Sequence, residues 1–164
     1  MKIGCIQMNM GFGKVEQNYE RAEALIRQAA EQGAEIIVLP EMWNSGYALE
    51  QLDELADVHG ERTQAFLSAL SKELGVHIVG GSVSTKEEDG FYNTMYTYNK
   101  DGEKVGTYNK AHLFRLMDEH LHLQAGDKMN RFALGDIEAA GVICYDIRFP
   151  EWLRAHALAG AKVL

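Results

Sequence analysis

Three residues with reactive side chains follow apolar stretches of this 164-residue chain, namely Glu41, Lys110 and Cys144. A carboxylate can accept and return a proton, an ammonium group can stabilise an oxyanion, and a thiolate is a strong nucleophile. Together the three groups can carry out nucleophilic attack on an acyl carbon. They are far apart in the sequence, so only the fold can bring them into one pocket.

Each of the three residues also has an ordinary structural interpretation. A glutamate after a strand or a lysine after a hairpin is usually a solvated surface charge. A cysteine that ends an apolar run is usually a small buried hydrophobe. The chemical interpretation therefore depends on the elements that position these side chains.

The first half of the chain predicts strands that alternate with helices. Apolar runs at 2–8, 35–39 and 76–83 predict buried strands. The strand–helix–strand order predicts a layered α/β fold with parallel pairing. Ligand sites in such folds lie beyond the carboxyl ends of the strands, which is where Glu41 follows the run at 35–39.

Two helices are predicted between these strands. Asn18 is a candidate N-cap for the first helix, and Gly33 is placed to end it in a left-handed conformation. Apolar residues at helical spacing predict the second helix over 62–74, with Gly75 as its end.

The second half of the chain predicts a different arrangement. The Tyr- and Thr-rich segment 91–109 is broken by a turn signal at 99–102, which predicts an antiparallel hairpin that ends just before Lys110. Residues 138–144 predict another buried strand. Pro150 fits the first position of a helix that runs to about 159.

The composition excludes several classes of protein. A net charge of -8 without clustered Lys and Arg argues against a nucleic-acid or anionic-membrane partner. No apolar run approaches the length of a membrane span, and the first residues do not resemble a signal peptide. Only Cys5 and Cys144 are present, which excludes a disulfide framework and favours a reducing, cytoplasmic location. No linker divides the chain, so residues 1–164 are predicted to form one domain.

Three separated motifs give these residues a context. They are LPE at 39–41, YNKAHLF at 108–114 and ICYDIRFPE at 143–151. In this order they resemble the nitrilase superfamily, the carbon–nitrogen hydrolases, and the resemblance covers residues 2–164. The segment PEMWNSGY at 40–47 and the third motif look most like the ω-amidase branch.

The resemblance implies a four-layer α-β-β-α sandwich. The last residues, GAKVL at 160–164, echo GAEIIVL at 33–39, where a helix ends and a central strand follows. A strand stub of this kind leaves a sheet unpaired. The chain is therefore expected to be the N-terminal portion of the domain, with the C-terminal part missing.

The resemblance also implies roles for the reactive residues. Cys144 matches the nucleophile that forms a thioester, and Glu41 matches the general base, whose pKa is expected to be raised by burial. Lys110 matches the lysine that faces the oxyanion, with the backbone N–H of Tyr145 as a second donor. Glu119 is the best match to a further glutamate that holds this lysine and orients substrate, although Asp118 is adjacent to it.

Further residues are assigned with less information. Trp43, Tyr47 and Tyr145 are candidate substrate-binding residues. Trp43 and Tyr47 follow Glu41 closely and are candidates for the pocket wall, although aromatic residues of this kind more often pack in a core. Arg148 and Glu151 are interpreted as structural ion partners that fix the loop of the third motif.

The implied function is hydrolysis of a small amide with release of ammonia. The ω-amidase branch acts on α-keto dicarboxylate monoamides, and the family usually forms homodimers. One alternative is a nitrilase or an N-carbamoyl amidohydrolase, and another is an inactive truncated fragment or pseudoenzyme of the same fold. A third alternative is a metal-binding protein with His112, His120 and His122 as ligands. These histidines lack a further ligand at standard spacing, and the resemblance implies neither a metal nor a cofactor.

Overall fold

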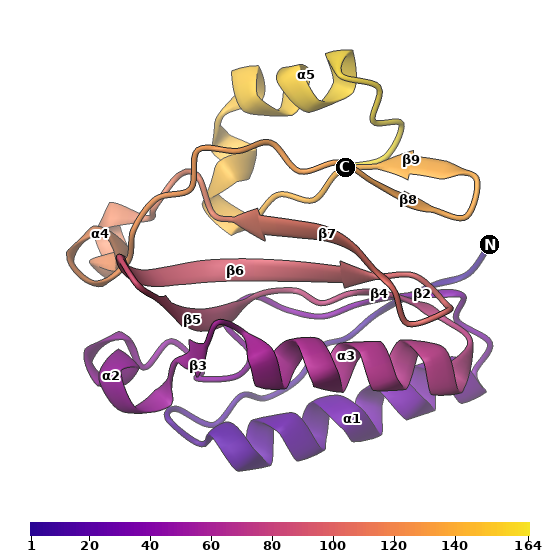
Figure 1. Ribbon diagram of the computed structural model, residues 1–164, viewed down its shortest axis with the longest axis horizontal. Coiled ribbons are helices and arrows are strands. Elements are labelled where there is room, and N and C mark those ends of the chain that lie inside the picture. The colour runs from indigo at the N-terminus through magenta and orange to yellow at the C-terminus, as the bar shows by residue number, and fades with distance from the viewer.

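A computed structural model describes residues 1–164 (Figure 1). The strands are β1 (Ile3–Cys5), β2 (Ile36–Val38), β3 (Asp57–Val58), β4 (His77–Val79), β5 (Val83–Glu87), β6 (Gly90–Tyr98), β7 (Lys104–Asn109), β8 (Phe132–Leu134) and β9 (Ile137–Ala139). The α-helices are α1 (Val15–Glu31), α2 (Leu52–Leu55), α3 (Glu61–Leu74), α4 (Glu119–His122) and α5 (Pro150–Leu158). Three short 3-10 turns complete the set: η1 (Leu49–Gln51), η2 (Arg115–Met117) and η3 (Cys144–Arg148).

A seven-stranded mixed sheet forms the centre of the structure, with strand order β1-β2-β4-β6-β5-β3 and with β7 paired to β6. Strands β1, β2 and β4 are parallel, as the strand–helix–strand order predicts. Strand β6 is antiparallel to β4, β5 and β7. The predicted hairpin of β6 and β7 is confirmed.

The two faces of this sheet are covered by different elements (Figure 1). Helices α1 and α3 pack on one face, where the largest hydrophobic core includes Ile26, Ile37, Leu67 and Ile78. On the other face lie the β8–β9 hairpin and, beyond it, α5. A smaller core that includes Ile36 joins this hairpin to the sheet. The order of layers agrees with the expected α-β-β-α sandwich.

Glycine residues end two helices, and a proline begins a third, where the sequence predicts. The chain has positive φ angles at Gly33 after α1 and at Gly75 after α3, the conformation that glycine adopts without a Cβ clash. Pro150 occupies the first turn of α5, where its missing N–H costs no hydrogen bond.

The predicted N-cap at Asn18 is wrong. Helix α1 starts at Val15, so Asn18 lies inside it and is fully buried. Its amide group donates to the carbonyl oxygens of Gly11 and Asn44, and its Oδ1 accepts from the Gly11 N–H. The side chain therefore ties the preceding loop to the segment that follows β2.

Three predicted strands differ from expectation. The run at 2–8 is regular only in β1, and it is not buried as predicted, because Ile3 and Cys5 are exposed. The run at 76–83 is divided into β4 and β5, because Gly81 has a φ of +58° and turns the chain. The run at 138–144 is regular only in β9, whose last residue, Ala139, forms an isolated parallel bridge with Val163.

None of the helices combines the length with the apolar character that crossing a membrane would require.

Candidate active site

Glu41 lies beyond the carboxyl end of β2 and is positioned by the loop that contains Ser82. The Ser82 N–H donates to the carbonyl oxygen of Pro40 at 3.0 Å. The Ser82 hydroxyl accepts from the Met42 N–H at 3.0 Å, and the Ser82 carbonyl accepts from the Trp43 N–H at 3.1 Å. These bonds fix the backbone on both sides of Glu41.

Gly81 allows this close approach of the two loops. A Cβ atom at this position would lie 2.0 Å from the carbonyl oxygen of Pro40, a distance that no side chain tolerates. The absence of a side chain at Gly81 therefore places the Ser82 loop against Glu41.

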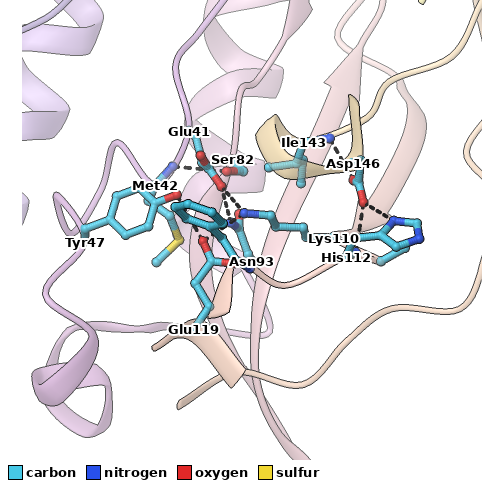
Figure 2. A network of polar contacts seen from close by, with 12 residues as sticks. Glu41, Met42, Tyr47, Ser82, Asn93, Lys110, His112, Glu119, Ile143 and Asp146 are labelled. Carbon is cyan, nitrogen blue, oxygen red and sulfur yellow. Dashed lines mark hydrogen bonds and ion pairs between the residues drawn. The ribbon is translucent and has the colours of Figure 1, made fainter. Parts of the chain in front are cut away.

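Lys110 lies directly after β7, and its side chain is fully buried. Its backbone N–H donates to the carbonyl oxygen of Asn93 at 2.9 Å. Its Nζ lies 2.7 Å from Oε1 of Glu41 and 2.8 Å from Oε1 of Glu119 (Figure 2). An ammonium group has three N–H donors, so one remains for a ligand.

Glu119 is the first residue of α4 and is also fully buried. Besides Lys110, its carboxylate accepts hydrogen bonds from the Tyr47 hydroxyl at 3.2 Å and from the Phe114 N–H at 2.8 Å. The adjacent Asp118 is exposed and is not bonded to the lysine. The structure thus brings Glu119, and not Asp118, to Lys110.

Cys144 begins η3 and has a φ of +44°, which is uncommon for a residue with a side chain. Its side chain is exposed. Cys144 and Glu41 line the same cavity of about 470 Å³, whose wall consists mainly of hydrophobic side chains from both sheets. A sharp turn that presents a nucleophile to a cavity is a recurring arrangement in hydrolases.

The pKa of Glu41 is shifted in the direction opposite to the one predicted. Burial raises the pKa of its carboxyl group, but hydrogen bonds from Lys110 and Tyr47 and the Lys110 charge outweigh burial, so the pKa is lowered. The prediction of a raised pKa is therefore wrong. Lys110 is subject to the same two opposing effects. Burial lowers the pKa of its ammonium group, but the hydrogen bonds to Glu119 and Glu41 outweigh burial, so the pKa is raised overall.

The thiol of Cys144 is neutral at rest. Burial and the nearby Glu41 carboxylate raise its pKa to about 11, against a smaller lowering effect of Lys110. The cluster at neutral pH therefore contains an ionised carboxylate beside a protonated thiol. This is the combination that general-base activation of a nucleophile requires.

The three predicted substrate-binding residues occupy different places. Tyr47 lies beside the cluster and bonds to Glu119. Trp43 is fully buried in the largest core and donates its indole N–H to Gly80, so it packs the core and does not line the cavity. The ring of Tyr145 packs against Phe114 and lines a separate surface cavity.

Asn93 of β6 belongs to the cluster, and the sequence did not indicate it. Its side-chain amide donates to Oε1 of Glu41 at 2.8 Å, the same oxygen that accepts from Lys110. Its own Oδ1 is buried without a partner. The signal was hidden because Asn93 is one of several polar residues in a Tyr- and Thr-rich strand.

The histidines considered as metal ligands do not form a cluster. The His112 ring lies 2.7 Å from a carboxylate oxygen of Asp146. No group of three or more His, Cys, Asp and Glu side chains has an arrangement that could hold a metal ion.

Comparisons with known proteins give a consistent result. The model of the carbon-nitrogen hydrolase family matches residues 2–164. The chain is 48% identical over 162 residues to the 2-oxoglutaramate amidase of Bacillus subtilis. The matched region covers 99% of this chain and 62% of that protein. It is 34% identical over 171 residues to the human omega-amidase NIT2, with 99% and 61% covered.

A solved structure supports the same relationship at the level of the fold. Nit3 of Saccharomyces cerevisiae, a member of branch 10 of the nitrilase superfamily, superposes with a TM-score of 0.88 at 27% identity, and the match covers 98% of this chain and 61% of that one. The chain spans about three fifths of the length of these relatives.

Proposed function

Since this chain belongs to the carbon–nitrogen hydrolase family, we propose that it carries the catalytic residues of an amidase that releases ammonia from a small amide. The observation that carries the proposal is the cavity shared by Cys144 and Glu41, with Lys110 2.7 Å from the Glu41 carboxylate. This arrangement supplies a nucleophile, a base and an oxyanion donor at one place.

The first half of the reaction forms a thioester. Sγ of Cys144 attacks the amide carbon while Glu41 takes the thiol proton, and the carbonyl oxygen becomes an oxyanion. The remaining donor of Lys110 and the N–H of Tyr145, near the start of η3, stabilise this charge. The C–N bond then breaks, and Glu41 gives its proton to the departing ammonia.

The second half restores the enzyme. Glu41 accepts a proton from water, and the resulting hydroxide attacks the thioester carbon. When the C–S bond breaks, the proton returns to the sulfur of Cys144. Each half begins with an ionised carboxylate, and the lowered pKa keeps Glu41 in this form at neutral pH.

The substrate class that we infer is an α-keto dicarboxylate monoamide. Its support is the 48% identity to a 2-oxoglutaramate amidase and the 34% identity to an omega-amidase. A relative from Pyrococcus abyssi with the name nitrilase is 36% identical over 170 residues, so nitriles belong in any substrate test.

The experiment measures ammonia release by the intact protein from 2-oxoglutaramate, N-carbamoyl amino acids and simple nitriles. We expect 2-oxoglutaramate to have the highest kcat/KM. Cys144→Ala should abolish turnover with an unchanged circular dichroism spectrum, whereas Cys5→Ala, at the other free cysteine, should retain it. Turnover that persists in Cys144→Ala would reject the mechanism, and a folded wild type without activity on any substrate would favour a pseudoenzyme.

We also expect the protein to be a cytoplasmic homodimer. Both cysteines are free, which suits a reducing compartment. Exposed large apolar side chains, among them Leu116, Leu121 and Leu158, provide material for an interface. Light scattering of the intact protein tests the dimer.

A further inference from the structure

Asp146, two residues after Cys144, has a fully buried carboxylate that the proposed mechanism does not use. This carboxylate makes four hydrogen bonds, and those to Ile143 and His112 are drawn in Figure 2. Oδ1 accepts from the backbone N–H of His112 at 2.9 Å and lies 2.7 Å from Nδ1 of the same residue. Oδ2 accepts from the Tyr108 hydroxyl at 2.7 Å and from the Ile143 N–H at 3.0 Å.

The partners of Asp146 are close in sequence to two reactive residues. Tyr108 and His112 lie two positions before and after Lys110, and Ile143 directly precedes Cys144. One buried carboxylate thus joins the segment that carries the ammonium group to the turn that carries the thiol.

The backbone of Cys144 needs such support. A φ of +44° is unfavourable for a residue with a Cβ and persists only where the surroundings hold it. The bond from the Ile143 N–H to Asp146 closes the turn around Cys144, in the manner of a capping side chain.

The far side of the carboxylate is equally constrained. The ring of His112 stacks on Phe149, with centroids 3.7 Å apart and planes 14° apart. The Tyr108 hydroxyl, which donates to Asp146, also accepts from the indole N–H of Trp152 at 3.0 Å. Neither the His112 ring nor the Tyr108 ring can turn away from Asp146 without losing these contacts.

The sequence predicted a different origin for this rigidity. Arg148 and Glu151 were expected to fix the loop as ion partners, but both are exposed and neither forms an ion pair. That prediction is wrong, because Asp146, through hydrogen bonds to His112 and Ile143, fixes the turn in their place.

We propose that Asp146 is a positioning residue that, together with His112, holds the sulfur of Cys144 at its place beside Glu41 and Lys110. Its effect on turnover rests on the proposed amidase function. Its effect on the thiol does not, so the two can be tested separately.

The informative variant is Asp146→Asn. A carboxylate accepts hydrogen bonds on both oxygens, whereas an amide accepts on one side and donates from the other. In either orientation, the NH₂ group of the introduced amide would face a backbone N–H, that of Ile143 or that of His112. The variant therefore loses at least one of these two hydrogen bonds, while the volume of the side chain hardly changes.

The readout is the pH dependence of alkylation at Cys144 by iodoacetamide in the intact protein, followed by peptide mass spectrometry. In the wild type the thiol pKa is raised to about 11 by burial and by Glu41. If the turn relaxes, the already exposed sulfur moves away from the Glu41 carboxylate, which then raises the thiol pKa less. In Asp146→Asn we expect the midpoint of the alkylation rate against pH to shift down by about one pH unit or more, toward the pKa of a free thiol, about 8.5.

Two controls separate positioning from general destabilisation. Asp136→Asn makes the same change at an exposed aspartate in the turn between β8 and β9, and should leave the midpoint where it is. Cys5, the other exposed thiol, serves as an internal reference, and its alkylation profile should be the same in all variants. A variant that is merely less stable but folds with the same site geometry would keep the wild-type midpoint at Cys144.

Turnover provides the second readout. We expect Asp146→Asn to lower kcat by at least about tenfold with little change in KM, because the substrate cavity remains while the nucleophile is displaced. A folded Asp146→Asn protein with an unchanged alkylation midpoint would overturn the proposal, whether or not the protein is active. If this variant does not fold, His112→Phe decides by the same criterion, since it retains the stack on Phe149 and removes only the ring bond to Asp146.

Discussion

The ammonium group of Lys110 lies 2.7 Å from Oε1 of Glu41, and this contact keeps a largely buried carboxylate ionised. Asn93 donates to the same oxygen at 2.8 Å. Oε2 takes part in neither of these two bonds. The base of the proposed mechanism is thus held in both charge and orientation before substrate binds.

Replacing Asn93 by Ala should move the acid limb of the kcat/KM profile to higher pH. The side-chain amide stabilises the charged form of Glu41, so its removal raises the pKa of the carboxyl group, by roughly one unit for a bond to a charged group. A pH–rate profile measures the shift, with exposed Asn9→Ala as the control. An acid limb that stays in place would show that the Asn93 bond does not tune the base.

Replacing Lys110 by Met should destabilise the fold by about 3–5 kcal/mol as well as abolish turnover. The substitution leaves Glu41 and Glu119 facing each other without the intervening charge. Lys86→Met, at a partly exposed lysine paired with Asp53, should cost less than about 1 kcal/mol. Urea unfolding gives both values, and equal losses in the two variants would contradict a special role for the buried pair.

The contribution of Glu41 to stability should depend on acid pH. Its pKa in the folded protein lies below the unfolded value of 4.5, so the ionised form stabilises the fold above pH 4.5. This stabilisation is lost as the pH falls through the lower pKa of the folded state. The difference in unfolding free energy between wild type and Glu41→Gln should therefore shrink between about pH 6 and pH 3, as measured by urea unfolding at several pH values. A constant difference would mean that the charge on Glu41 does not stabilise the protein.

Glu119→Gln should move the alkaline limb of the pH–rate profile to lower pH. After the opposing effect of burial, the bond to Glu119 is the strongest influence on the pKa of Lys110, and it raises that pKa. An uncharged amide of the same size supports the ammonium less well, so the lysine loses its proton at lower pH. Glu88→Gln, at an exposed glutamate, is the matched control. An unchanged alkaline limb would indicate that Glu119 acts on substrate and not through Lys110.

Local patterns were sufficient for much of the fold. Apolar periodicity, the glycines at 33 and 75 and the proline at 150 predicted helix positions within a few residues, because these signals act through neighbouring residues. The predicted N-cap at Asn18 failed because it relied on such local signals alone. Its side chain bonds to Asn44, which is distant in the sequence, and a long-range partner outweighs a local preference.

The identities of Glu41, Lys110 and Cys144 as candidates were readable from residue type and from the motifs around them, since chemistry depends first on which functional groups are present. Their charge states were not readable. Lys110 and Tyr47 lower the pKa of Glu41 against the effect of burial, whereas burial and the Glu41 carboxylate raise the pKa of Cys144. Electrostatic energies depend on distance and on exclusion of water, and neither is defined until the chain has folded.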